Sequence, residues 1–407
     1  MKKKIYIEGE GCDRRLLEKT KILKYLEKNN YEFTRRPSKA DYILLFTCAF
    51  KKEEEDYSLD RLRALQNYRG RLLVYGCLPD IAPYRLGDFD SICKLAPKDL
   101  DQIDDFFDGI KVKYADVTNP HAIADSPKAA FVQKVRRNLY NHDFLANRIL
   151  HFRDLFLKPK EYYYLMVCRG CLGTCSYCAI RRAVGSVKSK PITAILAEFQ
   201  QGLKAGYQDV VLLGDDLGAY GLDGPGTLPI LMKSLQEEIK SFCGLSPKSS
   251  SKDTLVRFHL KEVHPKYLLR YEESLDQFLD RQTVRSLLCP IQSGSPRILE
   301  LMQREHTVED VKRLIGKVRK LSPTIELSTQ IIAGFPTESD EDFEATLALV
   351  ADLKFRWVVV FPYDRKIGTP AAEMTGQVSS SVIHTRVRRA LKYFRHNGIK
   401  AFINCPW

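Results

Sequence analysis

The 407-residue sequence lacks any apolar run that approaches the roughly 20 residues needed to cross a bilayer. It also lacks the apolar core of a signal peptide at its start, because Met1-Lys-Lys-Lys-Ile-Tyr-Ile7 leads directly into a strand-like segment. These two absences exclude the integral-membrane and secreted classes of protein. The sequence therefore predicts a cytoplasmic protein with no membrane partner.

Acidic residues are fewer than basic ones: 51 Asp and Glu stand against 64 Lys and Arg, which gives a net charge of +13. A surplus of this kind suits a polyanionic partner such as RNA, but ordinary basic soluble proteins also show it. Apolar residues make up 44% and charged residues 28% of the chain, as is typical of globular proteins. The length leaves room for two or three domains.

Cysteine, in contrast, is abundant, with 11 residues. Disulfides are rare in the cytoplasm, and an odd number of cysteines cannot pair completely. The cysteines therefore indicate metal ligation or redox chemistry.

Three of the cysteines form a CxxxCxxC run, Cys171-Leu-Gly-Thr-Cys175-Ser-Tyr-Cys178, shortly after the apolar segment 162–167. Three thiolates on one tight loop can bind three irons of a cubane iron–sulfur cluster and leave the fourth iron without a protein ligand. A structural zinc site normally takes four protein ligands and a redox CxxC takes two, so neither explains the run well. Packing alone gives cysteines no reason to fall at ligand spacing. The run predicts a cluster with an iron open to chemistry.

This run resembles the cluster loop of the radical S-adenosylmethionine (SAM) enzymes. The resemblance implies that Cys171, Cys175 and Cys178 are the ligands and that the open iron binds the amino and carboxylate groups of SAM. It also implies that Tyr177, the aromatic residue before the last cysteine, lies next to the adenine. No catalytic side chain beyond the cluster ligands is predicted.

The first hundred residues read as alternating strands and helices, and a cysteine follows each of three predicted strands. The strands are expected at 3–7, 42–46 and 72–75, and the helices at about 14–29 and 54–68. In an open parallel sheet the carboxyl ends of the strands share one edge, so Cys12, Cys48 and Cys77 are expected to converge there. The alternative is that they are merely small, half-buried residues at strand ends.

The motifs around these cysteines resemble those of the methylthiotransferase family. They are Glu10-Gly-Cys12, Phe46-Thr-Cys48 and Tyr75-Gly-Cys77. The resemblance implies that Cys12, Cys48 and Cys77 hold an auxiliary iron–sulfur cluster. The family usually has Asn three residues after the first cysteine, where this chain has Arg15. This departure is expected to alter the pocket wall without removing a ligand.

From about residue 160 onward, strand-like runs alternate with helical stretches. The runs are 162–167, 210–214, 255–260, 286–291, 325–332 and 357–363. They predict an incomplete parallel (β/α)6 barrel, with its function at the carboxyl ends of the strands.

The predicted fold class is therefore α/β: an N-terminal open parallel domain, then a partial radical SAM barrel and a short helical tail. The expected boundaries are 1–115 for the N-terminal domain, 116–158 for a basic helical connection, 159–375 for the barrel and 376–407 for the tail. The connection carries Lys134, Arg136, Arg137 and Arg148 and is expected to brace the two domains.

Several segments of the second half resemble the methylthiotransferases rather than radical SAM enzymes at large, so that the resemblance covers about residues 3–375. They are Val211-Leu-Leu-Gly-Asp-Asp-Leu-Gly-Ala-Tyr220; Pro290-Ile-Gln-Ser-Gly-Ser295 with Leu299-Glu-Leu-Met302 and Arg304; Ile332-Ala-Gly-Phe-Pro336 with Glu338; and Tyr363 with Arg365, Gly368, Thr369 and Pro370.

The resemblance implies that five residues of these segments help to bind SAM, namely Gly214, Asp215, Asp216, Gln292 and Ser293. Glycine allows a close backbone approach, and the polar side chains offer hydrogen bonds to a carboxylate or a ribose. Each residue also has a structural interpretation: the two aspartates, for example, suit a turn or a helix cap.

Two further residues depart from the family pattern: Cys289 stands where His is usual, and Gln330 where Asp is usual. Both are expected at strand ends that face the active cavity, which leaves the substrate and the handling of protons open. Cys168 is interpreted as a packing residue, because three ligands suffice for the cluster. The other cysteines without a partner at ligand spacing are Cys93, Cys243 and Cys405.

The resemblance implies two [4Fe–4S] clusters, SAM and an external electron donor of the flavodoxin or ferredoxin type. In the family, the reduced cluster cleaves SAM to a 5′-deoxyadenosyl radical, which abstracts hydrogen from an unactivated carbon. Sulfur then comes from the auxiliary cluster, and a second SAM can supply a methyl group. The two domains are therefore expected to face one cavity that excludes water.

In the tRNA and ribosomal-protein methylthiotransferases a small β-domain, called TRAM, follows the barrel and holds the substrate. Here about thirty residues follow Gly368-Thr-Pro370, too few for a five-stranded barrel, so TRAM is expected to be absent. The residues read as one basic amphipathic helix at 382–395 and a tail. Its basic residues could contact phosphate, although a solvated face over the barrel is favoured. They are Arg386, Arg388, Arg389, Lys392 and Arg395.

The sequence thus predicts a radical SAM sulfur-inserting enzyme that acts on a macromolecule. A peptide or protein side chain is favoured slightly over a tRNA adenosine. The remaining alternative is a non-catalytic iron–sulfur protein that binds RNA or passes electrons, and the retained barrel segments argue against it.

Overall fold

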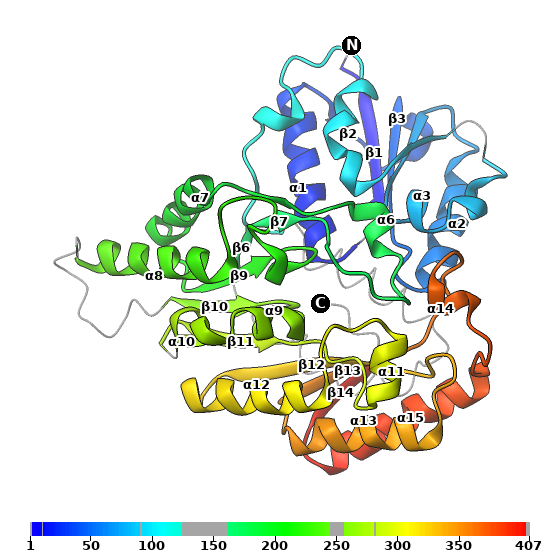
Figure 1. The fold of residues 1–407 in the computed structure, drawn as a ribbon. Helices are drawn as coiled ribbons and strands as arrows, with labels where there is room; N and C mark the ends of the chain where they lie inside the picture. Colours follow the sequence, from blue (N-terminus) through cyan, green and yellow to red (C-terminus); the bar gives the residue numbers. More distant parts are fainter. Residues whose placement is uncertain are drawn as a thin grey trace. The chain divides into compact units, whose positions relative to one another are not determined.

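The computed structural model of the chain describes residues 2–9, 11–89, 92–123, 162–244, 256–280 and 282–403. The chain divides into two compact units, Met1–Tyr162 and Tyr163–Trp407 (Figure 1). Glu10, Cys405 and the four basic residues expected in the connection lie outside the described residues. Within the described part of the chain, no helix combines the length and the apolar character that a membrane crossing requires.

The first unit is built on a five-stranded parallel sheet in the order β2-β1-β3-β4-β5. Its elements are β1 (Lys4–Gly9), α1 (Asp13–Lys28), β2 (Glu32–Phe33), β3 (Tyr42–Thr47), α2 (Lys52–Leu65), β4 (Arg71–Gly76), α3 (Leu78–Ile81) and β5 (Cys93–Leu95). The central strand β3 is buried along its whole length, which is why it reads as a continuous apolar run. The predicted open parallel α/β domain is confirmed.

The second unit is built on a seven-stranded sheet in the order β14-β13-β12-β11-β10-β9-β6, with β14 and β6 as its edges. Its strands are β6 (Tyr162–Met166), β9 (Asp209–Leu213), β10 (Arg257–Leu260), β11 (Val284–Leu288), β12 (Glu326–Ala333), β13 (Trp357–Pro362) and β14 (Lys400–Ile403), besides a separate pair, β7 (Cys168–Arg169) and β8 (Lys188–Ser189). The neighbours from β9 to β14 run parallel. This sheet confirms the expected partial barrel.

Helices follow the strands of this sheet, and several cover one side of it (Figure 1). They are α6 (Ile180–Val184), α7 (Ile192–Lys204), α8 (Leu228–Gly244), α9 (Pro265–Arg270), α10 (Leu275–Phe278), α11 (Pro296–Leu301), α12 (Val308–Leu321), α13 (Asp340–Asp352), α14 (Pro370–Glu373) and α15 (Ser380–His396). Fully buried rings such as Phe199, Phe258 and Phe343 belong to the core of this unit. Each such ring stabilises the fold by about 1.5–3 kcal/mol through its removal from water.

The C-terminal segment contains a strand that the sequence did not predict. The helix expected at 382–395 is present as α15, and β14 then pairs in parallel with β13, placing Ala401 beside Val358. The sheet therefore has seven strands instead of the six expected. The run Lys400–Ile403 is too short to show a period, so only its pairing with β13 identifies it as a strand.

Helix α15 packs its apolar stripe, including Ile383, Val387 and Phe394, against the sheet and α13. This confirms that the helix covers the barrel. Arg386 is only 7% exposed, and its guanidinium binds Glu338 at 2.9 Å and Asp340 at 2.7 Å. The inclusion of Arg386 among candidate phosphate contacts was therefore wrong, because a buried ion pair already occupies its charge.

Candidate functional site

The three cysteines of the first unit follow three neighbouring strands. Cys12 comes after β1, Cys48 after β3 and Cys77 after β4, and these strands lie side by side in parallel. Their carboxyl ends therefore share one edge of the sheet, as the sequence predicted. Cys12 precedes α1 and Cys77 precedes α3, so each lies where a strand gives way to a helix.

The backbone brings the segments of Cys48 and Cys77 into direct contact. The backbone N–H of Cys77 donates to Thr47 O at 3.3 Å, and Thr47 immediately precedes Cys48. Gly76 makes this approach possible: its φ is +130°, and a Cβ there would lie 2.1 Å from Thr47 O. A larger residue would clash with the neighbouring strand. Gly76 thus allows the segments that carry Cys48 and Cys77 to lie close together.

Arg15, at the position where the family usually has Asn, lies in a buried polar group behind Cys12. Its Nη1 atom lies 3.0 Å from Glu18 Oε2, and both side chains are at most 5% exposed. Tyr75 of β4 donates its hydroxyl to the same carboxylate at 2.5 Å. Arg15 therefore pairs with Glu18 within α1, and Glu18 in turn links α1 to Tyr75 of β4. The departure from the family pattern leaves Cys12, Cys48 and Cys77 in their places after the strands.

The CxxxCxxC loop of the second unit is anchored through its backbone. Cys171 N donates to Gly185 O at 3.0 Å, just after α6. Ser176, which is fully buried, donates its N–H to Met302 O at 3.0 Å and its hydroxyl to Leu301 O at 2.7 Å, and accepts from Ala371 N at 2.9 Å. Sequence reasoning missed this anchor, because nothing in the loop marks the serine between two cysteines as a core residue.

The three cysteines fit the donor set of a cubane cluster with one open iron. Gly173 carries no side chain at the point where a Cβ would lie 3.2 Å from Cys171 Sγ and 3.8 Å from Cys175 Sγ. The loop thus leaves room above two of the sulfurs. Among the described residues no three His, Cys, Asp or Glu side chains gather around a single ion, and a cubane does not require this because each ligand binds a different iron.

Asp216 is the polar centre behind this loop. Its Oδ2 atom accepts from Tyr267 OH at 2.8 Å, from Leu172 N at 3.3 Å and from the Cys171 thiol at 3.4 Å. Burial raises the pKa of Asp216 despite these hydrogen bonds. Burial and the nearby Asp216 carboxylate also hold the pKa of the Cys171 thiol well above its usual range, so iron has to displace a proton there.

The neighbours of Asp216 also contact the loop segment. Asp215 Oδ2 accepts from Gly170 N at 2.9 Å, one residue before Cys171. Gly214 allows Cys168 to approach, because a Cβ on Gly214 would lie 2.5 Å from Cys168 Sγ. Cys168 is 2% exposed within the core, as its interpretation as a packing residue predicted. SAM binding by Gly214, Asp215 and Asp216 stays a prediction, and their contacts in the structure position the cluster loop.

Gln292 and Ser293 lie just beyond β11 and have different surroundings. Gln292 is buried with φ at +69°, and its Oε1 atom has no hydrogen-bond partner among the described residues. A buried carbonyl without a partner has capacity for a ligand. Ser293 instead shares a hydrogen bond with Thr346 Oγ1 at 3.2 Å and accepts from Ser295 N at 3.1 Å. Of the two predicted SAM-binding residues, Gln292 is the one whose prediction is supported by a polar atom without a hydrogen-bond partner among the described residues.

The two residues of the second unit that depart from the family pattern, Cys289 and Gln330, are both buried. Cys289 is 1% exposed, and its backbone N–H and C=O bind Ser328 and Thr329 of β12. Gln330 is 8% exposed, and its side-chain amide lies 3.5 Å from Glu262 Oε1. Both lie on or beside the strands that carry the site, and their roles toward a substrate stay predictions.

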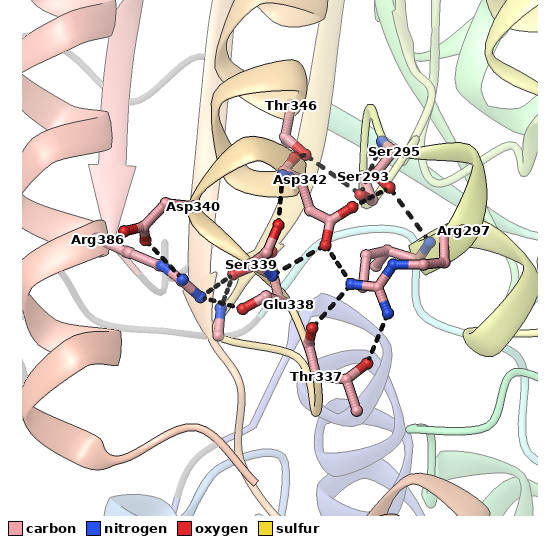
Figure 2. A network of polar contacts seen from close by, with 12 residues as sticks. Ser293, Ser295, Arg297, Thr337, Glu338, Ser339, Asp340, Asp342, Thr346 and Arg386 are labelled. Atoms are coloured by element: carbon pink, nitrogen blue, oxygen red, sulfur yellow. Dashed lines mark hydrogen bonds and ion pairs between the residues drawn. The ribbon is translucent and has the colours of Figure 1, made fainter. Parts of the chain in front are cut away.

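A polar network joins the segment after β11 to the start of α13 (Figure 2). Asp342 Oδ1 accepts from Ser295 Oγ at 2.6 Å, while its Oδ2 accepts from Ser339 N at 2.9 Å and from Arg297. Arg297 also donates to Thr337 O at 2.8 Å. Ser339 and Asp342 form a capping box, a sequence signal that could have identified Asp342 beforehand.

Asp342→Asn is expected to destabilise the protein by about 2 kcal/mol at pH 7. Burial raises the pKa of Asp342, but hydrogen bonds from Ser295, Ser339 and Arg297 outweigh it and lower the pKa to about 2. The folded state therefore binds fewer protons than the unfolded state, so this stabilisation is complete above about pH 4 and is lost as the pH falls toward 2. Urea unfolding between pH 7 and pH 3 measures the free energy of unfolding and its slope.

The matched control is Asp352→Asn, which removes the same charge from an exposed site at the other end of α13. We expect the acid-dependent slope to persist in this control and to flatten in Asp342→Asn. Equal slopes in the two variants would contradict the assignment.

Two family profiles match the chain. The radical SAM superfamily profile matches residues 165–350, and a profile described as uncharacterized protein family UPF0004 matches residues 4–95. The first range contains the loop Cys171–Cys178, and the second contains Cys12, Cys48 and Cys77. Each group of cysteines thus lies within a recognised family segment.

Named relatives cover nearly the whole chain. Ribosomal protein uS12 methylthiotransferase RimO of Geotalea uraniireducens is 30% identical over 98% of this chain and 84% of its own length. RimO of Geobacter sulfurreducens is 30% identical over 96% of this chain and 81% of its own length. Threonylcarbamoyladenosine tRNA methylthiotransferase of Xenopus laevis is 28% identical over 96% of this chain and 65% of its own length.

Two solved structures resemble the fold. The radical SAM methyltransferase TsrM from Kitasatospora setae, with cobalamin and a [4Fe–4S] cluster bound, has a TM-score of 0.58 at 12% identity over 91% of this chain and 77% of that chain. The cobalamin-dependent radical SAM enzyme OxsB has a TM-score of 0.55 at 12% identity over 98% of this chain and 62% of that chain. At this identity the likeness concerns the fold, and it confirms the predicted fold class.

Proposed function

The chain belongs to the radical SAM methylthiotransferase family, and from that membership we propose that it attaches sulfur or a methylthio group to a polypeptide side chain. As a member it is an enzyme that uses SAM and [4Fe–4S] clusters. The observation that carries the proposed reaction is the pairing of a three-cysteine loop with three further cysteines on one sheet edge.

We propose that Cys171, Cys175 and Cys178 hold the cluster that binds SAM, and that Cys12, Cys48 and Cys77 hold the auxiliary cluster. When bound, these groups supply hydrogen abstraction from an unactivated carbon and a source of sulfur. The chain's own residues position them: Ser176 anchors the loop, and Asp216 orients its first turn. Gln292, with its unused carbonyl, is the SAM-binding residue that the contacts favour.

A polypeptide substrate is supported by the relatives with the highest identity given above, which are named for ribosomal protein uS12. Ribosomal protein uS12 is therefore the first substrate to test. A tRNA substrate is the second candidate, favoured by the net charge of +13 and by the tRNA-modifying relative at 28% identity. An external donor of the flavodoxin or ferredoxin type would supply the electrons.

The test uses the full chain, reconstituted anaerobically with iron and sulfide and reduced with dithionite in place of the natural donor. SAM is added with uS12 protein or with unmodified tRNA, and 5′-deoxyadenosine and the mass of each macromolecule are measured. We expect 5′-deoxyadenosine together with a mass gain of sulfur, with or without methyl, on the protein. A gain on tRNA alone would overturn the polypeptide proposal, and no gain on either would overturn the proposed reaction for both substrates.

A further inference from the structure

A buried arginine lies directly against the proposed cluster loop. Arg304, between α11 and α12, is 7% exposed. Its Nη1 atom donates to Cys175 Sγ at 3.3 Å and to Tyr177 OH at 3.3 Å, and its Nη2 atom donates to Pro290 O. The guanidinium thus reaches a sulfur that the proposed function assigns to the cluster.

Among the described residues no carboxylate pairs with Arg304, and its Nε atom has no hydrogen-bond partner. The carboxylate of the adjacent Glu305 pairs instead with Lys266 at 2.6 Å. The ionisable groups that raise the pKa of Arg304 most are Tyr177 and the thiols of Cys175 and Cys289. A buried guanidinium without a counter-charge is costly, so the site is built to hold a negative group beside this cation.

The neighbouring histidines do not supply that negative group, and they add no positive charge. His264 and His306 are 9% and 7% exposed, with ring centroids 5.4 Å apart. Burial and the nearby Arg304 charge lower the pKa of His306 to about 3 and hold that of His264 well below its usual range. Both rings are therefore neutral near pH 7, and the positive charge beside Cys175 comes from Arg304.

We propose that Arg304 sets the reduction potential of the cluster held by Cys171, Cys175 and Cys178. Reduction adds one electron from the external donor to a cluster whose thiolate ligands are already negative. A fixed cation that donates a hydrogen bond to a ligand sulfur stabilises the reduced state more than the oxidised state. Arg304 is therefore a positioning residue that acts through Cys175, and it makes the cluster easier to reduce. This inference rests on the proposed ligand set.

The experiment measures the midpoint potential of this cluster directly. The variant Cys12→Ala/Cys48→Ala/Cys77→Ala serves as parent, so that a single cluster contributes to the EPR signal during a redox titration. In Arg304→Gln we expect the ratio of reduced to oxidised cluster at a given potential to fall at least tenfold, a shift of about 59 mV to lower potential. Arg304→Met should behave alike, and Arg304→Lys, which keeps the charge, should fall between parent and Gln variant.

The matched control is Arg285→Gln, which removes an exposed arginine on β11 that is paired with Glu326. It should leave the midpoint unchanged. A parental midpoint in either neutral Arg304 variant that loads iron would overturn the proposal. A loss of affinity for SAM without a change of midpoint would also overturn the proposal, because Arg304 would then act by binding the cofactor. Absence of a cluster in the parent itself would overturn the ligand set as well, which separates the two failures.

Discussion

Replacement of Cys171, Cys175 and Cys178 together by alanine is expected to reduce 5′-deoxyadenosine formation to background and to remove about four irons per chain. The three thiolates are the iron donors, and no other residue of the loop can replace them. The fold should survive, because the loop is anchored by Ser176 through three hydrogen bonds that involve no sulfur. Iron content after anaerobic reconstitution and 5′-deoxyadenosine by chromatography provide the measurements.

Cys168→Ala is the matched control for this variant. Cys168 lies three residues before the loop, but it is 2% exposed and packs in the core, with its thiol 3.5 Å from Asp216 O. The control should keep the parental iron content and the parental rate of 5′-deoxyadenosine formation. A triple variant that retains the full iron content, or a Cys168 variant that loses half of it, would refute the proposed ligand set.

Replacement of Cys12, Cys48 and Cys77 by alanine is expected to lower the iron content from about eight to about four per chain and to abolish sulfur transfer. The variant should still form 5′-deoxyadenosine, because the loop Cys171–Cys178 lies in the other unit of the chain. Iron analysis, 5′-deoxyadenosine and the mass of the substrate together distinguish loss of sulfur from loss of radical formation. Unchanged iron content would remove the auxiliary cluster from the proposal.

Cys93→Ala is the control here, since Cys93 belongs to the same sheet but to a different part of it. It begins β5 and lies in register with Leu73, in the middle of β4 and well before Cys77. Its thiol therefore lies away from the edge where the other three cysteines follow their strands. The control should keep both the iron content and sulfur transfer.

Much of the fold was accessible from hydrophobic patterns alone. The buried strands β3 and β9 consist mainly of apolar residues, and the sequence predicted both of them. Strand β14 was missed because four residues carry no period, and its identity comes from its neighbour β13. Long strands and amphipathic helices can be predicted from the pattern of neighbouring residues in the sequence. A short edge strand can be identified only from its pairing with another strand.

Some residues of the candidate site could likewise be predicted from local sequence, and others could not. The ligand cysteines could be predicted, because their spacing within one loop and their places after strands are local features. The role of Asp216 could not, since its contact with Tyr267 joins residues 51 positions apart. The sequence indicated a cofactor contact or a turn for Asp216, whereas in the structure its carboxylate accepts hydrogen bonds from Leu172 of the cluster loop and from Tyr267 of α9.

The spacing of Cys171, Cys175 and Cys178 required no tertiary information, because a tight loop of this length brings three thiolates together in any fold that presents it. The electrostatic environment of that loop, in contrast, depends on the tertiary structure. Arg304 reaches Cys175 across 129 positions of sequence, and the fold buries its charge at a place where no carboxylate of the described residues pairs with it. Local spacing decides which atoms can bind iron, while packing at long range decides the charge that those atoms experience.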